Sequence, residues 1–381
     1  MQIFSDITSI WSAVMAELLP FLFVLTIVVF FHELGHFLVA RWCGVSVKAF
    51  SIGFGPELAG FNDRQGTRWK LSLIPLGGYV KFIDDENAAS VPDREALERM
   101  SATERAKTLQ GQPVARRAAI VAAGPIANFI LAFVIFTAMF ATVGRLVTEP
   151  KVGSVIEGSA AAAAGVQVGD IITAIDDDPI ESFGDLQRII SDMADRPLRI
   201  GIRRGNETIE IVATPQWREI TDRFGNVQRI GLLGIGSPED PADSKLVKYD
   251  VLNAAALAAG EIGFIVTRTF SYIYDIIVGR QAADQLSGPL RIAQVSGQAA
   301  TLGFLALINL AAVLSISIGL INLFPIPMLD GGHLFYYAIE AVRRRPLSEK
   351  AQEWGFRVGL ALVLALMIFV TFSDLVHRGF L

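Results

Sequence analysis

Charged residues and cysteine are both scarce in this sequence. Asp, Glu, Lys and Arg make up 19% of its 381 residues, below the roughly 25% that is usual in soluble domains. The net charge of −5 argues against a nucleic-acid partner, which requires a basic surface. The single cysteine, Cys43, excludes a disulfide within the chain. Residues 1–17 lack the basic start of a cleavable signal peptide, so we expect the first apolar run to be retained.

Long apolar runs, by contrast, are abundant. Four of them, at about residues 19–40, 118–143, 302–324 and 358–372, approach or exceed the ~20 residues that cross a bilayer. They predict a polytopic α-helical membrane protein with four transmembrane helices. A fifth run, residues 252–278, carries Glu261, Arg268 and Asp275 at a spacing of seven, which places them on one stripe of a helix. We interpret it as an amphipathic helix lying on the membrane surface, with a further span as the competing interpretation.

The first apolar run contains His32-Glu33-Leu34-Gly35-His36. Residues four apart on a helix differ by roughly 40° in rotation, so both imidazoles share one face and could bind one Zn²⁺. Glu33 is placed to take the proton of a water bound there. The alternative is a chance match with two core histidines. Three ionisable groups inside a membrane run are costly, however, and they indicate a functional site.

A second candidate follows the third run. Pro325 and Pro327 cannot continue a helix, so we expect extended backbone that presents Asp330 at the membrane edge. His333 is interpreted as a residue near the metal or on the surface, with ligation as the alternative.

Topology decides whether these residues meet. Asp330 reaches the histidines only if the ends of the first and third runs lie on one membrane face, which requires a single crossing between them. Basic residues cluster on that face, and the positive-inside rule makes it cytoplasmic. The region between the second and third runs, and both termini, are then periplasmic. The basic positions are Arg41, Arg116, Arg117, Arg343, Arg344 and Arg345.

Two regions have the alternation of β-structure. Residues 45–82 predict a hairpin or small sheet, with a polar turn at 62–66 and a bend at Gly77-Gly78. This hairpin is either a clamp that holds substrate as an added strand or a membrane-docking element. Residues 151–236 predict a soluble module with strands at 153–156, 171–175, 198–203 and 207–213 and a helix at 183–193. Residues 158–172 resemble a PDZ domain of the type found in bacterial proteases, which indicates a recognition or gating part.

The order of these motifs over essentially the whole chain resembles the site-2 protease family, and within it the bacterial regulator of sigma-E protease group. The resemblance implies His32, His36 and Asp330 as zinc ligands and Glu33 as the catalytic acid/base. Two histidines and one carboxylate leave the fourth zinc position open, as in catalytic rather than structural sites. Well-known members carry two PDZ domains, and this chain shows one. The residues expected to contact substrate are Asn322, Asn128 (for which a hydrogen bond to a neighbouring helix is the alternative), Pro325, Pro327 and Gly331.

The resemblance implies a monomeric zinc endopeptidase of the bacterial inner membrane, with its active site towards the cytoplasm. Its substrates would be single-span membrane proteins, such as trimmed anti-sigma factors or signal-peptide remnants. An inactive PDZ-bearing scaffold and a metal transporter are the alternatives. The expected parts are residues 1–44 (first helix), 45–83 (β region), 84–115 (cytoplasmic polar segment), 116–146 (second helix), 147–237 (PDZ-like domain), 238–301 (linker and interfacial helix), 302–335 (third helix) and 336–381 (basic loop and fourth helix).

Overall fold

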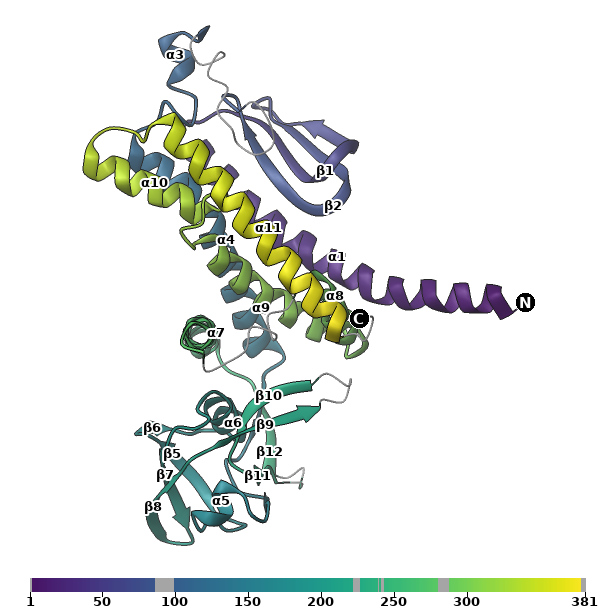
Figure 1. The fold of residues 1–381 in the computed structure, drawn as a ribbon, viewed down its shortest axis with the longest axis vertical. Helices are drawn as coiled ribbons and strands as arrows, with labels where there is room; N and C mark the ends of the chain where they lie inside the picture. Colours follow the sequence, from purple (N-terminus) through teal and green to yellow (C-terminus); the bar gives the residue numbers. More distant parts are fainter. Residues whose placement is uncertain are drawn as a thin grey trace. The chain divides into compact units, whose positions relative to one another are not determined.

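The computed structural model describes residues 2–85, 99–221, 227–238, 240, 243–279 and 288–377. The chain divides into two compact units (Figure 1). The first comprises Met1–Phe136 and Ala258–Leu381, and the second comprises Thr137–Leu257. Long helices and a β hairpin form the first unit, whereas short strands and two short helices dominate the second. Part of the expected polar segment, residues 86–98, lies outside the described residues.

Five helices in the described part of the chain are long and apolar enough to cross a membrane. Four correspond to the predicted spans: α1 (Gln2–Trp42), α4 (Val114–Thr142), α9 (Phe304–Asn322) and α11 (Glu349–His377). Their mean hydropathies lie between 2.3 and 2.5, whereas that of α7 (Val251–Ile277) is 1.3. By length and composition α7 therefore qualifies as a fifth candidate. The described part of the first unit has three shorter helices: α3 (Ala102–Arg105), α8 (Pro289–Thr301) and α10 (Asp330–Arg343).

Glycines bring the helices around the site close together. A Cβ on Gly35 of α1 would lie 2.2 Å from the carbonyl oxygen of Ala123 on α4. A Cβ on Gly319 of α9 would lie 3.1 Å from the carbonyl oxygen of Pro125 on α4. Such small residues allow helix backbones to approach one another within a membrane. As a result, α4 contacts both the helix that carries the two histidines and the helix that leads to Asp330.

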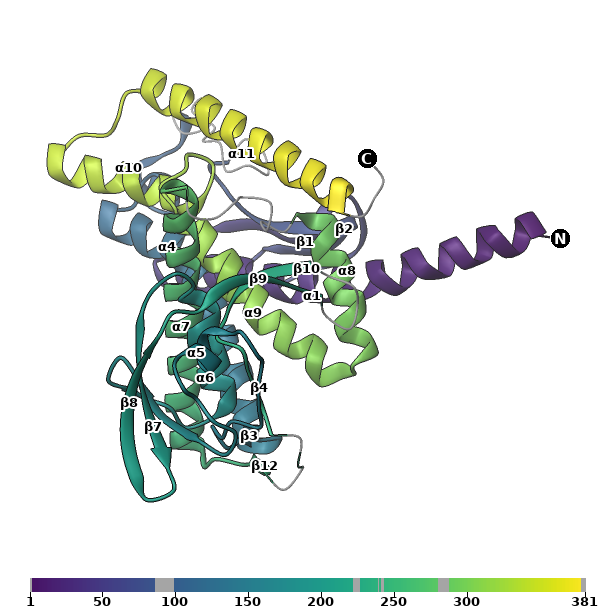
Figure 2. The ribbon, with the colours of Figure 1, turned by 60° about the horizontal axis from the view of Figure 1, so that its bottom comes forward.

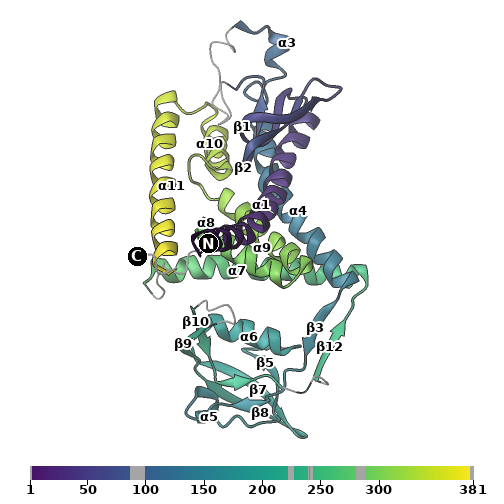
Figure 3. The same cartoon turned by 90° about the vertical axis from the view of Figure 1, so that its right-hand side faces the viewer.

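The predicted hairpin consists of β1 (Val47–Asn62) and β2 (Arg68–Phe82), which pair antiparallel. Residues 49–52 pair with 68–71 on one side and with 78–81 on the other, because both long strands bend. The resulting strand segments follow the order 57–62, 68–72, 47–52 and 78–82. Phe50 and Val80 pack with Phe37 of α1 and Ile120 of α4, and Figure 3 shows the hairpin beside the end of α1. Segment 78–82 is therefore an edge held against the helix of the histidine motif.

The second unit has a four-stranded sheet in the order β6 (Asp178–Pro179), β5 (Ile171–Ile175), β7 (Leu198–Arg204) and β8 (Glu207–Ala213). Its core contains Leu186 of α6 (Phe183–Asp192). Arg204 donates to Asp170 at 2.8 Å and holds the pKa of that buried carboxyl below its ordinary value. Figure 2 shows β7 and β8 side by side. The remaining elements are α5 (Ala160–Ala163) and the pairs β9 (Gln216–Thr221) with β10 (Val227–Leu232), β4 (Ser154–Val155) with β11 (Ile235–Gly236), and β3 (Arg145–Thr148) with β12 (Ser244–Val247).

The sequence analysis missed α8 and the pairs β9–β10 and β3–β12. Residues 288–301 lie within a predicted linker region, but they form α8, which packs along α1. Its Gly297 contacts the backbone of α1, since a Cβ there would lie 3.0 Å from the Cα of Glu17. A short helix with polar spots has little periodicity of its own, and its stability comes from this tertiary contact.

Candidate metal centre and active site

Helix α1 places His32 and His36 one turn apart with their rings edge to face. The ring centres are 4.8 Å apart, and the two Nε2 atoms are 3.2 Å apart. The spacing of four residues on a continuous helix places both side chains on the same face. Both Nε2 atoms therefore point to the same place.

Asp330 reaches that place from the turn between α9 and α10. Its Oδ2 lies 3.2 Å from His32 Nε2 and 3.5 Å from His36 Nε2. The turn is tight, because a Cβ on Gly331 would lie 2.2 Å from the carbonyl oxygen of Phe324. The prediction of extended backbone at Asp330 is wrong: extended conformation ends at Leu329, and Asp330 is the first residue of α10. A carboxylate is favoured there by the helix dipole.

These three atoms fit a zinc ion. Ligands at 2.0–2.2 Å from tetrahedral zinc lie about 3.3–3.6 Å from one another, and the observed separations are 3.2, 3.2 and 3.5 Å. Asp330 Oδ2 is buried and makes no hydrogen bond among the described residues. No other group of three His, Cys, Asp or Glu ligand atoms converges in this way within the described residues.

The far side of the His36 ring is fixed by α4. His36 Nδ1 lies 2.9 Å from the carbonyl oxygen of Ile120, so Nδ1 carries the proton and Nε2 is free to bind a metal. The ring sits where a side chain on Gly124 would be, since a Cβ there would lie 2.2 Å from His36 Nε2. Gly124 therefore makes room for a ligand of the neighbouring helix, a role that depends on a contact the sequence does not reveal.

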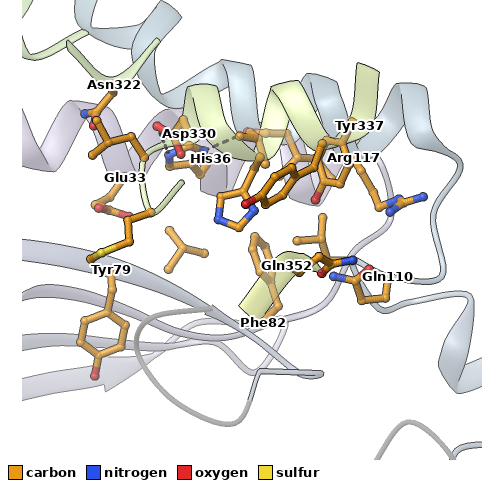
Figure 4. A pocket seen from close by; sticks show the side chains of 18 of the residues that line it. Glu33, His36, Tyr79, Phe82, Gln110, Arg117, Asn322, Asp330, Tyr337 and Gln352 are labelled. Atoms are coloured by element: carbon orange, nitrogen blue, oxygen red, sulfur yellow. Dashed lines mark hydrogen bonds and ion pairs between the residues drawn. The ribbon is translucent and has the colours of Figure 1, made fainter. Parts of the chain in front are cut away.

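A cavity of about 340 Å³ opens beside the three ligands (Figure 4). Glu33 and Asn322 line it at the metal end, as does Tyr79 of β2. The edge segment approaches Glu33 closely, because a Cβ on Gly78 would lie 3.1 Å from Glu33 Cγ. The carboxyl that is not a ligand thus shares the cavity with the triad and with a strand edge.

The opposite end of the cavity holds a partly buried ion pair that sequence reasoning missed. Arg117 of α4 donates to Glu340 of α10 at 2.6 Å, and its guanidinium lies 4.9 Å from the centre of the Tyr337 ring. Burial raises the pKa of Tyr337 to about 12, so its hydroxyl stays protonated. The pair ties α10, which begins with Asp330, to α4. Arg117 was interpreted only as a topology marker.

The remaining predicted residues fall into three groups. Asn322 and His333 line the cavity, and burial lowers the pKa of His333, which keeps its imidazole neutral at pH 7. Asn128 is fully buried and lies against His32 of α1 rather than in the cavity, which matches the alternative of a hydrogen bond to a neighbouring helix. Three others shape the turn before α10 or contact neighbouring helices, and they are absent from the cavity lining: Pro325, Pro327 and Gly331.

Known families and proteins resemble this chain over most of its length. The sequence profile of peptidase family M50 matches residues 20–366. A protein of Agrobacterium fabrum whose name describes it as a zinc metalloprotease is 51% identical over 358 residues, covering 94% of this chain and 95% of its own. A zinc metalloprotease by name from Mesorhizobium japonicum is 48% identical over 362 residues, covering 95% of this chain and 99% of its own.

Metalloprotease MmpA of Caulobacter vibrioides is 39% identical over 380 residues, covering 94% of this chain and 95% of its own. A solved PDZ domain of an SdrC-like protein from Listeria monocytogenes matches 23% of this chain and 84% of its own, at 23% identity and a TM-score of 0.18. The family profile spans most of the chain, and the three relatives are similar over nearly their whole lengths. The chain therefore belongs to peptidase family M50, the site-2 protease family, and is a zinc-dependent metalloprotease with multiple apolar helices of membrane-spanning length.

Proposed function

We propose that the protein is an intramembrane endopeptidase that cuts within the transmembrane segments of single-span membrane proteins. The observation that carries this proposal is the position of the triad. Its two histidines lie within α1, whose residues Val14–Trp42 are apolar enough to span a bilayer, and its aspartate follows α9, another such helix. A substrate bond reaching the triad must therefore come from within or beside the membrane.

The roles of the residues follow from their positions. Zinc held by His32, His36 and Asp330 would supply a Lewis acid with one open position. Glu33 lines the cavity and is not one of the three ligands. We assign it to accept a proton from the attacking water and to deliver that proton to the leaving amine. Asn322 lines the same end of the cavity and is placed to donate to the substrate backbone.

A transmembrane substrate must unwind before it can be cut, which exposes backbone groups that have no partner in lipid. Segment 78–82 offers such a partner, because four of its residues line the cavity: Gly78, Tyr79, Val80 and Phe82. Its outer edge pairs with no strand in the described ranges of the chain. Strand addition at this edge would hold the unwound substrate beside Glu33. Exposed apolar side chains elsewhere on the hairpin, including Leu58, Leu73 and Leu76, suit contact with lipid, so docking and clamping are compatible.

The substrates we propose are single-span proteins such as anti-sigma factors already trimmed by another protease, or signal-peptide remnants. In proteoliposomes we expect cleavage of such a protein inside its apolar segment, with the site located by mass spectrometry of both products. Asp330→Ala is the control and should give no product. Cuts only outside the apolar segment, or equal cutting by Asp330→Ala, would contradict the proposal.

We further propose that α1, α4, α9 and α11 cross the inner membrane and that α7 lies along its surface. The C-terminal ends of α1 and α9 meet at the triad and so lie on one membrane face. The number of crossings between the end of α1 and the start of α9 must therefore be odd. Crossing by both α4 and α7 would make two, and α8, with 13 residues, is too short to add a third. In Figure 1, α7 is seen along its axis whereas α4, α9 and α11 are seen from the side, so α7 runs across their direction. The lower hydropathy of α7 also supports this arrangement.

Reporter fusions test this topology. Fusions after Gly205 and after Gly279 should both report the periplasm, because α7 does not cross between them. A fusion after Arg345 should report the cytoplasm, because α9 crosses before it. Opposite results for Gly205 and Gly279 would show that α7 crosses, and the same result for Gly279 and Arg345 would separate Asp330 from the histidines.

A further inference from the structure

The Asn128 side chain lies directly behind His32. It is fully buried on α4, and its Nδ2 lies 3.3 Å from His32 Nδ1. Its Oδ1 has no hydrogen-bond partner among the described residues. The Asn128 backbone is held separately, since its carbonyl oxygen accepts a hydrogen bond from Ser315 Oγ of α9 at 2.9 Å. The amide is therefore fixed beside the imidazole in a place that no substrate reaches.

Metal binding dictates the protonation of His32. Its Nε2 is the atom that faces His36 and Asp330, so a metal there requires the Nε2 lone pair. The proton of the neutral imidazole must then sit on Nδ1, which becomes a donor that needs an acceptor. An amide nitrogen is a donor only, and two donors facing each other across a buried contact are unfavourable.

A half-turn of the Asn128 amide exchanges Nδ2 and Oδ1 and gives Nδ1–H its acceptor. We propose that Asn128 is a positioning residue whose Oδ1 accepts the hydrogen bond of His32 Nδ1–H, fixing the tautomer and ring orientation of this ligand. The Ile120 carbonyl does the same for His36. Helix α4 thus orients both histidines of α1, one with its backbone and one with a side chain. This inference rests on the zinc site proposed above.

The test measures zinc affinity, by chelator competition, in the purified full-length protein. Asn128→Leu removes the acceptor and should weaken zinc binding by about 10- to 100-fold, the usual effect of losing a partner of a ligating histidine. Asn128→Asp retains an acceptor oxygen and should stay within a few-fold of the wild type. Ser315→Ala is the matched control, because Ser315 donates its hydrogen bond to the Asn128 backbone and not to the Asn128 side chain, and the zinc affinity of this variant should be unchanged.

A second readout is the visible absorption of the Co²⁺-substituted protein, which reports ligand geometry. It should change in Asn128→Leu and be preserved in Asn128→Asp and Ser315→Ala, with a melting curve to show that each variant is folded. Wild-type affinity in Asn128→Leu, or an equal loss in Asn128→Asp and Asn128→Leu, would overturn the inference. His32→Ala separates the two proposals: if it binds zinc as well as the wild type does, the zinc site itself is wrong.

Discussion

Glu33→Gln is expected to abolish proteolysis while the protein keeps about one zinc ion per chain. Glu33 lines the cavity but is not among the three converging ligand atoms. The amide cannot accept and deliver a proton, so the rate should fall by at least about 10²- to 10⁴-fold. Product formation from a single-span substrate and zinc content by atomic absorption are the two measurements.

His36→Ala is the companion variant, because it should lose both activity and zinc. If Glu33→Gln retained substantial activity, the assignment of the acid/base would be wrong. If it lost zinc as completely as His36→Ala does, Glu33 would have to be counted among the ligands.

Gly124→Ala should also inactivate the enzyme, although it replaces neither a zinc ligand nor the catalytic acid/base. The added methyl would lie 2.2 Å from His36 Nε2 and 2.4 Å from its Cε1, closer than non-bonded atoms approach. The ring must therefore leave its position and lose its contact with the Ile120 carbonyl. We expect zinc affinity to fall by at least about 10-fold, with proteolysis reduced accordingly.

Gly263→Ala on α7 provides the matched control, because no atom of the described residues outside its own helix turn lies within 4 Å of a Cβ there. An exchange of glycine for alanine in an open helical position should be neutral or slightly stabilising. A Gly124→Ala protein that held zinc with wild-type affinity would show that the ring or α4 shifts without cost. The role of Gly124 would then be packing alone.

The features that could be predicted from the sequence are those that depend on the spacing of residues close together in the chain. The face shared by His32 and His36 follows from four residues of helix, and the strands of the second unit follow from short apolar runs between turns. The bend at Gly77-Gly78 and the hairpin also appear where alternation places them. These features need no knowledge of distant contacts.

The features that could not be predicted from the sequence depend on contacts between helices that are distant along the chain. Asn128 has an amide that suits a substrate or a histidine equally well, and only its contact with His32, 96 positions away, distinguishes the two. The start of α10 at Asp330 depends on glycines that fit against the carbonyls of the preceding turn. Pro325 and Pro327 signalled an end to the helix, but not that a new helix begins so soon.

The distance along the chain between the ligands has a consequence for biosynthesis. His32 is made roughly 300 residues before Asp330, which at about 5–20 residues per second corresponds to roughly 15–60 s of translation. During that interval the nascent chain offers zinc the two histidines without the Asp330 carboxylate. The metal is held firmly only after α9 has been inserted and α10 has begun to fold. We therefore expect the newly made enzyme to be inert while α1, α4 and α9 enter the membrane, at the stage when these helices most resemble its proposed substrates.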